Sequence, residues 1–451
     1  MERRVFPMSS DQALPNSRAL ERDAHLAMSE HKVAPSEIAI GVVIGRMSEY
    51  FDFFVFGIGS VLVFPKVFFP FLEPLQATLA SFAIFALAFV ARPLGTILFM
   101  EIGRRHGRFV KLTIALFLLG GSTAAVSFLP SYETIGIASI LLLAAFRIGQ
   151  GLALGGAWDG LASLLALNAP KEHRGWYAMI PQTGAPLGFM LASLLFAFFL
   201  MNLSTDDFVD WGWRYPFYVA FAVNVVALFA RLRLIATEDF TMLLDQSELR
   251  PAPIAEVVGV NGRVILIGAF VPLASFALFH LVTVFPISWI VLYTQRSAGE
   301  FLMVQFVGAM VCLGAIIASG LIADQIGRRR LLEVAAGLVA LFALASIVAP
   351  ILFDESAIGQ TIYVIVGFAL LGLSYGQSTG AATSNFAQRY RYTGAALTSD
   401  LAWLIGAGFA PLVALSLSSK FGLACVGVYL LSGAACTLMA VRFNTPEMRQ
   451  A

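Results

Sequence analysis

Seven ionisable side chains interrupt stretches of this chain that are otherwise apolar enough to cross a lipid bilayer. They are Arg46, Glu49, Asp52, Arg92, Arg147, Asp159 and Asp400. A charged side chain at the bilayer centre costs at least about 2.5 kcal/mol on the most lenient scale. Such a residue faces a partner or a watery cavity, where it can hold a charged solute or carry a proton. The first hypothesis is therefore a polar pathway through a membrane protein.

Two of the acids, Glu49 and Asp52, are three residues apart, so both project from one face of a helix. Burial disfavours the charged form of a carboxyl group. A buried acid can therefore take up a proton on one side of a membrane and release it on the other. We predict proton-coupling roles for Asp52, Glu49 and Asp159. The alternative for the first two is an ion pair with Arg46 or with an arginine of another span.

Arg92 and Arg147 cannot realistically lose their protons, and either can hold a substrate carboxylate through two hydrogen bonds. The alternative is a permanent salt bridge to Asp52, Glu49 or Asp159. If all the intramembrane groups are ionised, they comprise three positive and four negative charges. This balance favours a zwitterionic solute or a carboxylate carried together with a proton.

Other polar or amphipathic side chains are candidates for lining a substrate cavity, because pockets combine apolar walls with a few polar groups. The predicted contacts besides the two arginines are Tyr50, Gln182, His280, Tyr375, Gln377, Asp400 and Trp403. For His280 the alternative is a hydrogen-bonded core residue. For the aromatic cluster around Tyr50–Phe56 it is packing or lipid contact. For Asp159 and Asp400 it is a polar contact in the cytoplasmic half of the membrane.

The composition agrees with a membrane protein. Of 451 residues, 59% are hydrophobic and 13% are charged, whereas soluble domains carry about 25% charged residues. The net charge of +1 indicates no nucleic-acid partner. All 3 cysteines lie in apolar stretches and no metal-ligand spacing is present, so we expect no disulfide framework and no metal. The proton, as coupling ion, takes the place of a cofactor.

Apolar runs of about 20 residues are long enough to cross a bilayer as helices, and these runs lack the two-residue alternation of strands. Twelve candidates lie at about 38–65, 75–100, 110–129, 135–167, 177–200, 214–234, 263–292, 301–323, 331–352, 359–386, 394–417 and 420–442. The predicted fold class is an all-α integral membrane protein. The polar stretch 236–261 divides it into two six-helix bundles, 37–235 and 262–442, and the tails are 1–36 and 443–451.

Lysines and arginines gather in the loops on one side of this arrangement. The opposite loops carry Lys66, Arg214, Arg296 and Lys420. Since cytoplasmic loops carry an excess of positive charge, both tails and the linker 236–261 are expected in the cytoplasm. The tail 1–36 has no apolar run, so no cleavable signal peptide is expected.

One short loop occurs twice. Gly103-Arg104-Arg105-His106-Gly107-Arg108 recurs as Ala323-Asp324-Gln325-Ile326-Gly327-Arg328, each copy after the second span of its half. A glycine at a fixed place lets the chain turn tightly. Two six-helix halves related by a repeat are typical of alternating access, in which the halves rock about a site near the membrane midplane.

These loops resemble the cytoplasmic loop motif of the major facilitator superfamily, and Gly320–Arg330 is close to its full pattern. Further segments resemble its metabolite:proton symporters, which include permeases for α-ketoglutarate, shikimate, citrate and proline/betaine. These segments are Glu49–Phe53, Ala91–Gly95, Arg147–Gly156, Trp211–Arg214 and Arg391–Gly394. The resemblance runs from about residue 38 to 442 and implies twelve helices. It implies a gating role for Gly103, Arg105, Gly107, Arg108, Asp324, Gly327 and Arg328.

The chain also departs from the family pattern. In the first loop Arg104 stands where the family has Asp, and Met100 stands where it has the first Gly. Because that Asp latches the halves together on the cytoplasmic side, we predict a weaker N-terminal latch and a shift towards inward-facing states. Ala157 replaces the usual Glu and Asp400 the usual Asn, so the known substrates of the branch transfer poorly to this chain.

The sequence therefore predicts a transporter rather than an enzyme. We expect a monomer in the inner cell membrane that takes up a small organic acid or zwitterion with a proton by alternating access. Protons, membrane lipid and the solute are its expected partners. One alternative is an exporter or uniporter of another small solute, including an amine. The other is a membrane-embedded sensor.

Overall fold

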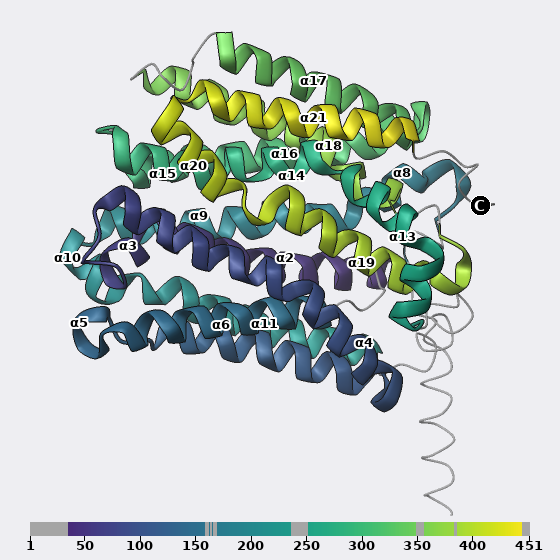
Figure 1. Ribbon diagram of the computed structural model, residues 1–451, viewed down its shortest axis with the longest axis horizontal. Helices are drawn as coiled ribbons and strands as arrows, with labels where there is room; N and C mark the ends of the chain where they lie inside the picture. Colours follow the sequence, from purple (N-terminus) through teal and green to yellow (C-terminus); the bar gives the residue numbers. More distant parts are fainter. Residues whose placement is uncertain are drawn as a thin grey trace, which may run out of the picture.

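The computed structural model describes residues 35–157, 162, 165, 169–235, 251–348, 356–382 and 386–443. Within these ranges every regular element is a helix, and the long helices run side by side along one axis (Figure 1). The prediction of an all-α fold is confirmed. Asp159, most of both predicted tails and linker residues 236–250 lie outside the described residues.

The long helices of the N-terminal half are α2 (Pro35–Leu62), α4 (Pro74–Ser127), α6 (Ile137–Gly156), α9 (Gly184–Asn202) and α11 (Arg214–Ile235). Short helices join them. These are α3 (Phe64–Val67), α5 (Tyr132–Ile135), η1 (Lys171–His173), α8 (Arg174–Met179), η2 (Ile180–Thr183), α10 (Thr205–Asp207) and η3 (Phe208–Gly212).

The C-terminal half has the same character, with more interruptions. Its helices are α13 (Ile254–Phe270), α14 (Leu273–Val282), α15 (Val284–Tyr293), α16 (Ala298–Ile326), α17 (Arg328–Val348), α18 (Ala357–Ala382), η4 (Gln388–Tyr390), α19 (Arg391–Trp403), η5 (Leu404–Gly408), α20 (Ala410–Phe421) and α21 (Ala424–Phe443).

Twelve spans follow from these helices. In the described residues, 10 helices are long and apolar enough to cross a membrane. One of them, α4, contains two of the predicted spans, because the chain turns at Gly107 with a φ of 86°. The first helix, α2, falls outside that set because Arg46, Glu49 and Asp52 interrupt its apolar sequence.

The seventh span begins later than the sequence indicated. The helix that starts at Ile254 ends at Phe270, and the apolar span runs from Leu273 to Tyr293. Pro272 separates the two because its nitrogen cannot donate a helical hydrogen bond. Part of the predicted linker 236–261 is thus the first two turns of α13, which packs against α19.

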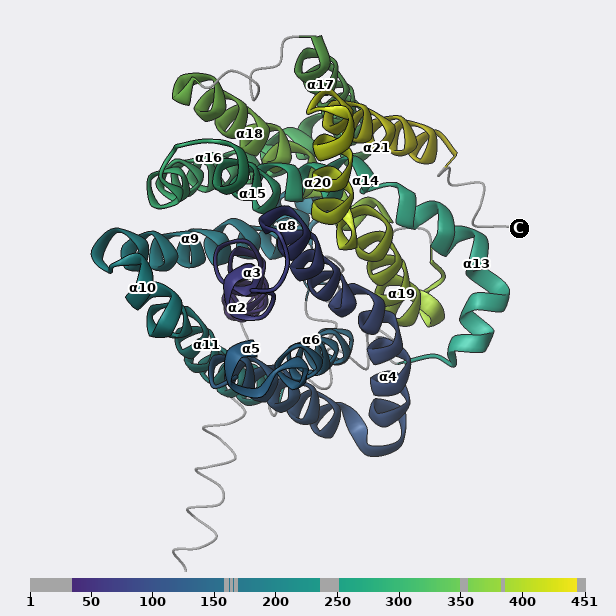
Figure 2. The ribbon, with the colours of Figure 1, turned by 60° about the vertical axis from the view of Figure 1, so that its left-hand side comes forward.

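The two halves form two groups of helices that face each other (Figure 2). They meet where α9 packs against α16, α2 against α15, and α4 against α19. The repeated loops, turned by Gly107 and by Gly327 at a φ of 87°, lie at one end of the bundle. We call this end the motif end. The opposite end carries α3, α5 and α10 (Figure 1).

Glycines bring α4 and α6 into close contact. A Cβ atom on Gly151 would lie 2.3 Å from the Ala88 carbonyl oxygen, and one on Gly155 would lie 2.3 Å from the Arg92 carbonyl oxygen. Small residues at four-residue spacing allow this approach of helix backbones. The packing fixes the segment of α4 that carries Arg92.

The seventh span is broken in mid-membrane at Thr283, between α14 and α15. The buried side chain of Gln305 on α16 donates hydrogen bonds of 2.7 Å to the carbonyl oxygens of both Val282 and Thr283. An unsatisfied backbone group in the membrane costs several kcal/mol. Gln305 therefore stabilises the break.

Candidate functional site

A small polar cavity lies between the two halves. It is lined by Arg46, Glu49, Tyr50, Phe53, Ala88, Phe89, Arg92, Leu154 and Trp403. The lining comes from α2, α4 and α6 of one half and α19 of the other. Its volume of about 30 Å³ is room for one or two water molecules. The structure therefore brings Tyr50, Glu49, Arg92 and Trp403 together, in a conformation closed around its centre.

A salt bridge joins the halves beside this cavity. Arg92 on α4 donates from Nε to Oδ1 of Asp400 on α19 over 2.7 Å. The Thr96 hydroxyl donates to the other carboxylate oxygen of Asp400. The side chain of Asp400 is 3% exposed and that of Arg92 is 14% exposed. Arg92 therefore forms a salt bridge in this structure, with Asp400 rather than with Asp52 or Glu49, and Asp159 lies outside the described residues.

Glu49 is shared between two arginines. Its Oε2 accepts from Arg46 Nη1 over 2.9 Å, and its Oε1 accepts from Arg231 Nη2 over 2.7 Å. The ion pair with Arg46 that the spacing allowed is therefore present. Arg231, near the end of the predicted span 214–234, lies buried on α11. One carboxylate faces two guanidinium groups at this point.

Aromatic rings from both halves close the cavity towards the opposite end. The hydroxyls of Tyr50 on α2 and Tyr375 on α18 are hydrogen-bonded across the halves. Phe54 stacks on Phe279 of α14 with ring centroids 5.3 Å apart. We call Phe53, Phe54 and Phe279 the aromatic layer. Trp403 completes the cluster, with its ring centroid 6.3 Å from that of Phe53.

His280 on α14 lies against this layer. Its ring centroid is 5.6 Å from those of both Phe53 and Phe85, and its side chain is fully buried. Among the described residues, neither ring nitrogen has a hydrogen-bond partner. His280 is therefore buried in the core, as the alternative predicted, but without the hydrogen bond that the alternative included. His280 holds two unused polar atoms beside the cavity.

A second polar network lies inside the N-terminal half. Asp52 accepts from the Thr123 hydroxyl and, over 3.3 Å, from Asn224 Nδ2. Gln150 Nε2 donates to the Thr123 oxygen over 2.9 Å, and Arg147 donates to Gln150 Oε1 over 3.0 Å. Asp52 and Arg147 are therefore connected through two intermediate side chains instead of a direct ion pair. Neither residue lines the central cavity.

Arg147 is held mainly by backbone and aromatic groups. Its Nε donates to the Phe85 carbonyl oxygen over 3.1 Å, and its guanidinium carbon lies 4.1 Å from the ring centroid of Phe56. Its Nη2 is buried and has no acceptor among the described residues. The predicted substrate contact at Arg147 is therefore separated from the cavity, next to the acid network.

At the motif end the second repeated loop contacts the other half. Asp324 Oδ1 accepts from the backbone nitrogens of Gly175 over 2.6 Å and Trp176 over 3.4 Å, in the first turn of α8. Gln377, predicted as a substrate contact, lies here and donates to the Gly175 carbonyl oxygen over 3.0 Å. A Cβ on Gly175 would lie 2.8 Å from the Gly320 carbonyl oxygen. The contact therefore requires glycine.

The first repeated loop is arranged differently. Arg104 pairs with Glu101 of the same helix over 2.7 Å and is half exposed, and Arg105 pairs with Glu101 as well. The link to the other half is made by Lys111, which is buried and donates to the Tyr392 hydroxyl of α19 over 3.1 Å. The Arg108 guanidinium lies 5.8 Å from the ring centroid of Tyr392.

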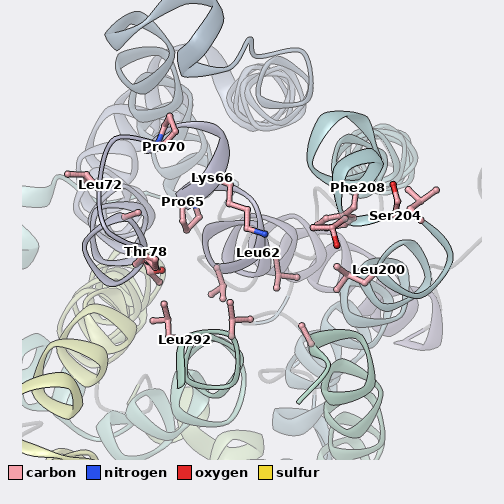
Figure 3. Close-up of a pocket in the computed structure, with 17 residues that line it drawn as sticks. Leu62, Pro65, Lys66, Pro70, Leu72, Thr78, Leu200, Ser204, Phe208 and Leu292 are labelled. Atoms are coloured by element: carbon pink, nitrogen blue, oxygen red, sulfur yellow. Dashed lines mark hydrogen bonds between the residues drawn. The ribbon is translucent and has the colours of Figure 1, made fainter. Parts of the chain in front are cut away.

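At the opposite end, a pocket of about 490 Å³ opens between the halves (Figure 3). Its lining includes Leu62, Leu200, Phe208 and Leu292, and among the described residues that line it Lys66 is the one charged side chain. Helix α2 borders both spaces, because Phe53 lines the central cavity and Val61 and Leu62 line this pocket. The aromatic layer, which includes Phe53, therefore lies between the pocket and the cavity. We call this pocket the vestibule.

Comparison with known proteins decides the family. Residues 38–411 match the family model described as Major Facilitator Superfamily. The chain belongs to the major facilitator superfamily. This member is 35% identical over 410 residues to the inner membrane metabolite transport protein YhjE of Escherichia coli (strain K12), covering 90% of this chain and 93% of the relative. It is 30% identical over 425 residues to the shikimate transporter of the same organism, covering 91% and 94%.

Solved structures of the superfamily share the fold. The crystal structure of a D-xylose–proton symporter superposes with a TM-score of 0.70 at 18% sequence identity, covering 90% of this chain and 96% of that one. The twelve-helix arrangement predicted from the sequence is thereby confirmed. The chain is a multi-pass membrane transporter of metabolites rather than an enzyme.

Sequence reasoning missed several residues of this superfamily member's polar networks. They are Thr96, Lys111, Thr123, Gln150, Asn224 and Tyr392. Asn224 and Gln150 could have been found, because each is an amide within an apolar span. Gln182, which was predicted, is buried in η2, and η2 packs against α2.

Proposed function

We propose that this transporter carries a small organic acid or zwitterion inward together with a proton, by alternating access between its halves. The observation that carries the proposal is the Arg92–Asp400 salt bridge, which joins the two halves beside the central cavity. Disconnecting Asp400 from Arg92 and Tyr375 from Tyr50 separates groups on opposite halves. A solute that binds between these groups can therefore control the separation.

The proposed substrate contact is Arg92, with Tyr50 and Trp403 as walls. A guanidinium group can bind a carboxylate through two parallel hydrogen bonds. Arg92 lines the cavity and is the more exposed partner of its salt bridge. His280 offers two further hydrogen-bonding atoms to a solute that parts the aromatic layer.

The proposed proton site is Asp52. When the carboxylate is ionised, the Thr123 hydroxyl donates to it. The same hydroxyl lies 3.0 Å from the Leu119 carbonyl oxygen, which is a second acceptor. A protonated Asp52 can donate to Thr123, which then donates to Leu119. One proton thus rearranges contacts between α2 and α4 without leaving a buried polar group unpaired.

We propose that the motif end faces the cytoplasm of the inner membrane. Arginines concentrate there in both loops, at 104, 105 and 108 and again at 328–330. Cytoplasmic loops carry such an excess, and anionic lipid on that side attracts it. The vestibule then faces outward, and solute enters past Lys66 (Figure 3). We propose a monomer as the transporting unit.

The test is uptake into proteoliposomes with an imposed inward proton gradient, using labelled shikimate and betaine. Accumulation should follow the gradient. Asp52→Asn should lower gradient-driven accumulation by at least about tenfold. Exchange of solute across the membrane should remain, because Asp52 does not line the cavity. Asp206→Asn, which changes an exposed acid at the opposite end, is the control. Accumulation that ignores the gradient, or an unchanged Asp52→Asn variant, contradicts the proposal.

A further inference from the structure

Two buried polar side chains, one from each half, lie behind the wall of the central cavity. His280 belongs to α14 of the C-terminal half and Arg147 to α6 of the N-terminal half. His280 is 0% exposed and Arg147 is 1% exposed. Among the described residues, neither ring nitrogen of His280 has a hydrogen-bond partner, and neither has Nη2 of Arg147. Because an unpaired buried polar group costs free energy, a solute that pairs with these atoms gains that free energy on binding.

The ring of Phe53 lies between these side chains and the cavity. Phe53 lines the cavity, and its ring centroid is 5.6 Å from that of His280 and 5.8 Å from the guanidinium carbon of Arg147. The ring of Phe85 contacts the same two side chains, at 5.6 Å and 4.7 Å. Since the cavity has a volume of about 30 Å³, a solute larger than water must displace part of its wall. Rotation of Phe53 makes that room and joins both side chains to the cavity.

The donors and acceptors of the two side chains match a hydroxyl group. In the described part of the chain, the aromatic rings in contact with His280 are those of Phe53, Phe85, Phe89 and Phe279. A buried charge without an opposite charge beside it is strongly disfavoured, so the imidazole is neutral, with one donor and one acceptor nitrogen. Arg147 Nη2 can only donate. A hydroxyl can accept from Arg147 and donate to His280, whereas an ionised carboxylate cannot donate and an ammonium group cannot accept.

We propose that His280 and Arg147 form a subsite that recognises a hydroxyl group of the substrate, and that the substrate is a hydroxylated carboxylic acid. This inference rests on the proposed function, because the carboxylate of the same solute binds at Arg92. The bond from Arg92 to Asp400 uses Nε, and the guanidinium group has further donors on its two Nη atoms. The carboxylate can therefore bind without first removing Asp400 from Arg92.

The subsite makes binding of the hydroxyl depend on the conformation of the cavity. The hydroxyl pairs with His280 and Arg147 only after Phe53 has moved aside. A ligand shifts a conformational equilibrium by the difference between its affinities for the two states. An acid without a hydroxyl still meets Arg92 but leaves the other two side chains unpaired. Because a site that hydrogen-bonds a hydroxyl rejects an analogue that lacks it, the subsite selects the hydroxylated acid.

The experiment measures binding of matched acids to the purified full-length transporter. The pairs are shikimate with cyclohex-1-ene-1-carboxylate and 3-hydroxybutyrate with butyrate, whose members differ only in their hydroxyl groups. The wild type should bind the hydroxylated member of at least one pair about tenfold more tightly or better. His280→Phe keeps an aromatic ring without a polar atom and should reduce this preference to less than about twofold. His280→Gln keeps a donor and an acceptor and should retain most of the preference. His106→Phe, which changes an exposed histidine at the motif end, is the control.

The inference is overturned if the wild type binds neither hydroxylated acid more tightly than its partner, or if the preference survives in His280→Phe. An equal loss of affinity for both members of a pair shows a distorted cavity without hydroxyl recognition and also overturns it. If His280→Phe does not fold, His280→Met carries the same comparison, because the flexible Met side chain fills irregular space. The proposed function fails by a different result. Uptake that ignores the proton gradient contradicts that function and leaves the hydroxyl preference in binding intact.

Discussion

The two repeated loops occupy equivalent places in the halves but hold the motif end by different chemistry. In the second loop, the acid Asp324 accepts hydrogen bonds from the backbone of α8. In the first, Arg104 pairs within its own helix, and the buried cation Lys111 reaches the Tyr392 hydroxyl. The comparison shows that the first loop lacks the family's Asp at position 104 and that Lys111, further along the same helix, makes the contact between the halves instead.

The two contacts between the halves also differ in the kind of partner group that each one uses. An acid at the first turn of a helix is stabilised by the N–H groups and the helix dipole, whatever the partner side chains are. The Lys111 contact uses a side-chain hydroxyl, that of Tyr392, and burying the ammonium group carries a desolvation cost. The second loop is therefore expected to contribute more to closure. The shift towards inward-facing states, expected from the loss of the first Asp, stays a prediction.

The largest effect is expected for Asp324→Ala. It removes a charged acceptor worth about 1.5–3 kcal/mol and leaves two backbone donors without it, so closure at the motif end should weaken about 10- to 100-fold. The measurement is the alkylation rate of a cysteine placed at Ser319, a buried residue beside the contact, in a background without the 3 native cysteines. Glu333→Ala, which removes an exposed helix pair, is the control.

A smaller effect is expected for Tyr392→Phe. It removes the hydroxyl that accepts from Lys111 across the halves and keeps the ring near Arg108, so we expect about a five- to tenfold rise in alkylation at the same cysteine. Tyr390→Phe is the matched control, because the Tyr390 hydroxyl bonds to Glu256 within the C-terminal half. If Tyr390→Phe has the larger effect, Lys111 does not hold the halves together.

The smallest effect is expected when the family residue is restored by Arg104→Asp. Arg104 is half exposed and its pair with Glu101 lies on one helix. Exposed pairs contribute about 0–1 kcal/mol, so uptake and alkylation should change less than about threefold. A change as large as that of Tyr392→Phe would mean that position 104 still controls the latch, and the contrast between the loops would fail.

The sequence predicted the features that depend on residues close together in the chain. Helix number followed from apolar length, the loop turns from Gly107 and Gly327, and the Arg46–Glu49 pair from three-residue spacing. Contacts between distant segments could not be predicted. Arg92 and Asp400 are 308 residues apart, and only the packing of the halves selects this partner over the other buried acids.

Arg231 is a second residue whose partner could not be predicted from the sequence. It lies near the end of the apolar run 214–234 and was not counted among the intramembrane charges, whereas helix packing buries it against Glu49. A count of intramembrane charges without Arg231 gives an excess of acid. Adding Arg231 to that count makes four positive and four negative charges. Charge balance in a membrane site therefore depends on where each helix ends.

The break at Thr283 gives the seventh span a built-in pivot. A continuous helix resists bending because each turn is tied to the next, but here Gln305 already holds the two carbonyl oxygens at the break. The outer segment α15 supplies Val291 and Leu292 to the vestibule wall. The segment α15 can therefore rotate about the break while α14 keeps His280 in place. This rotation breaks no further helical hydrogen bond at Thr283.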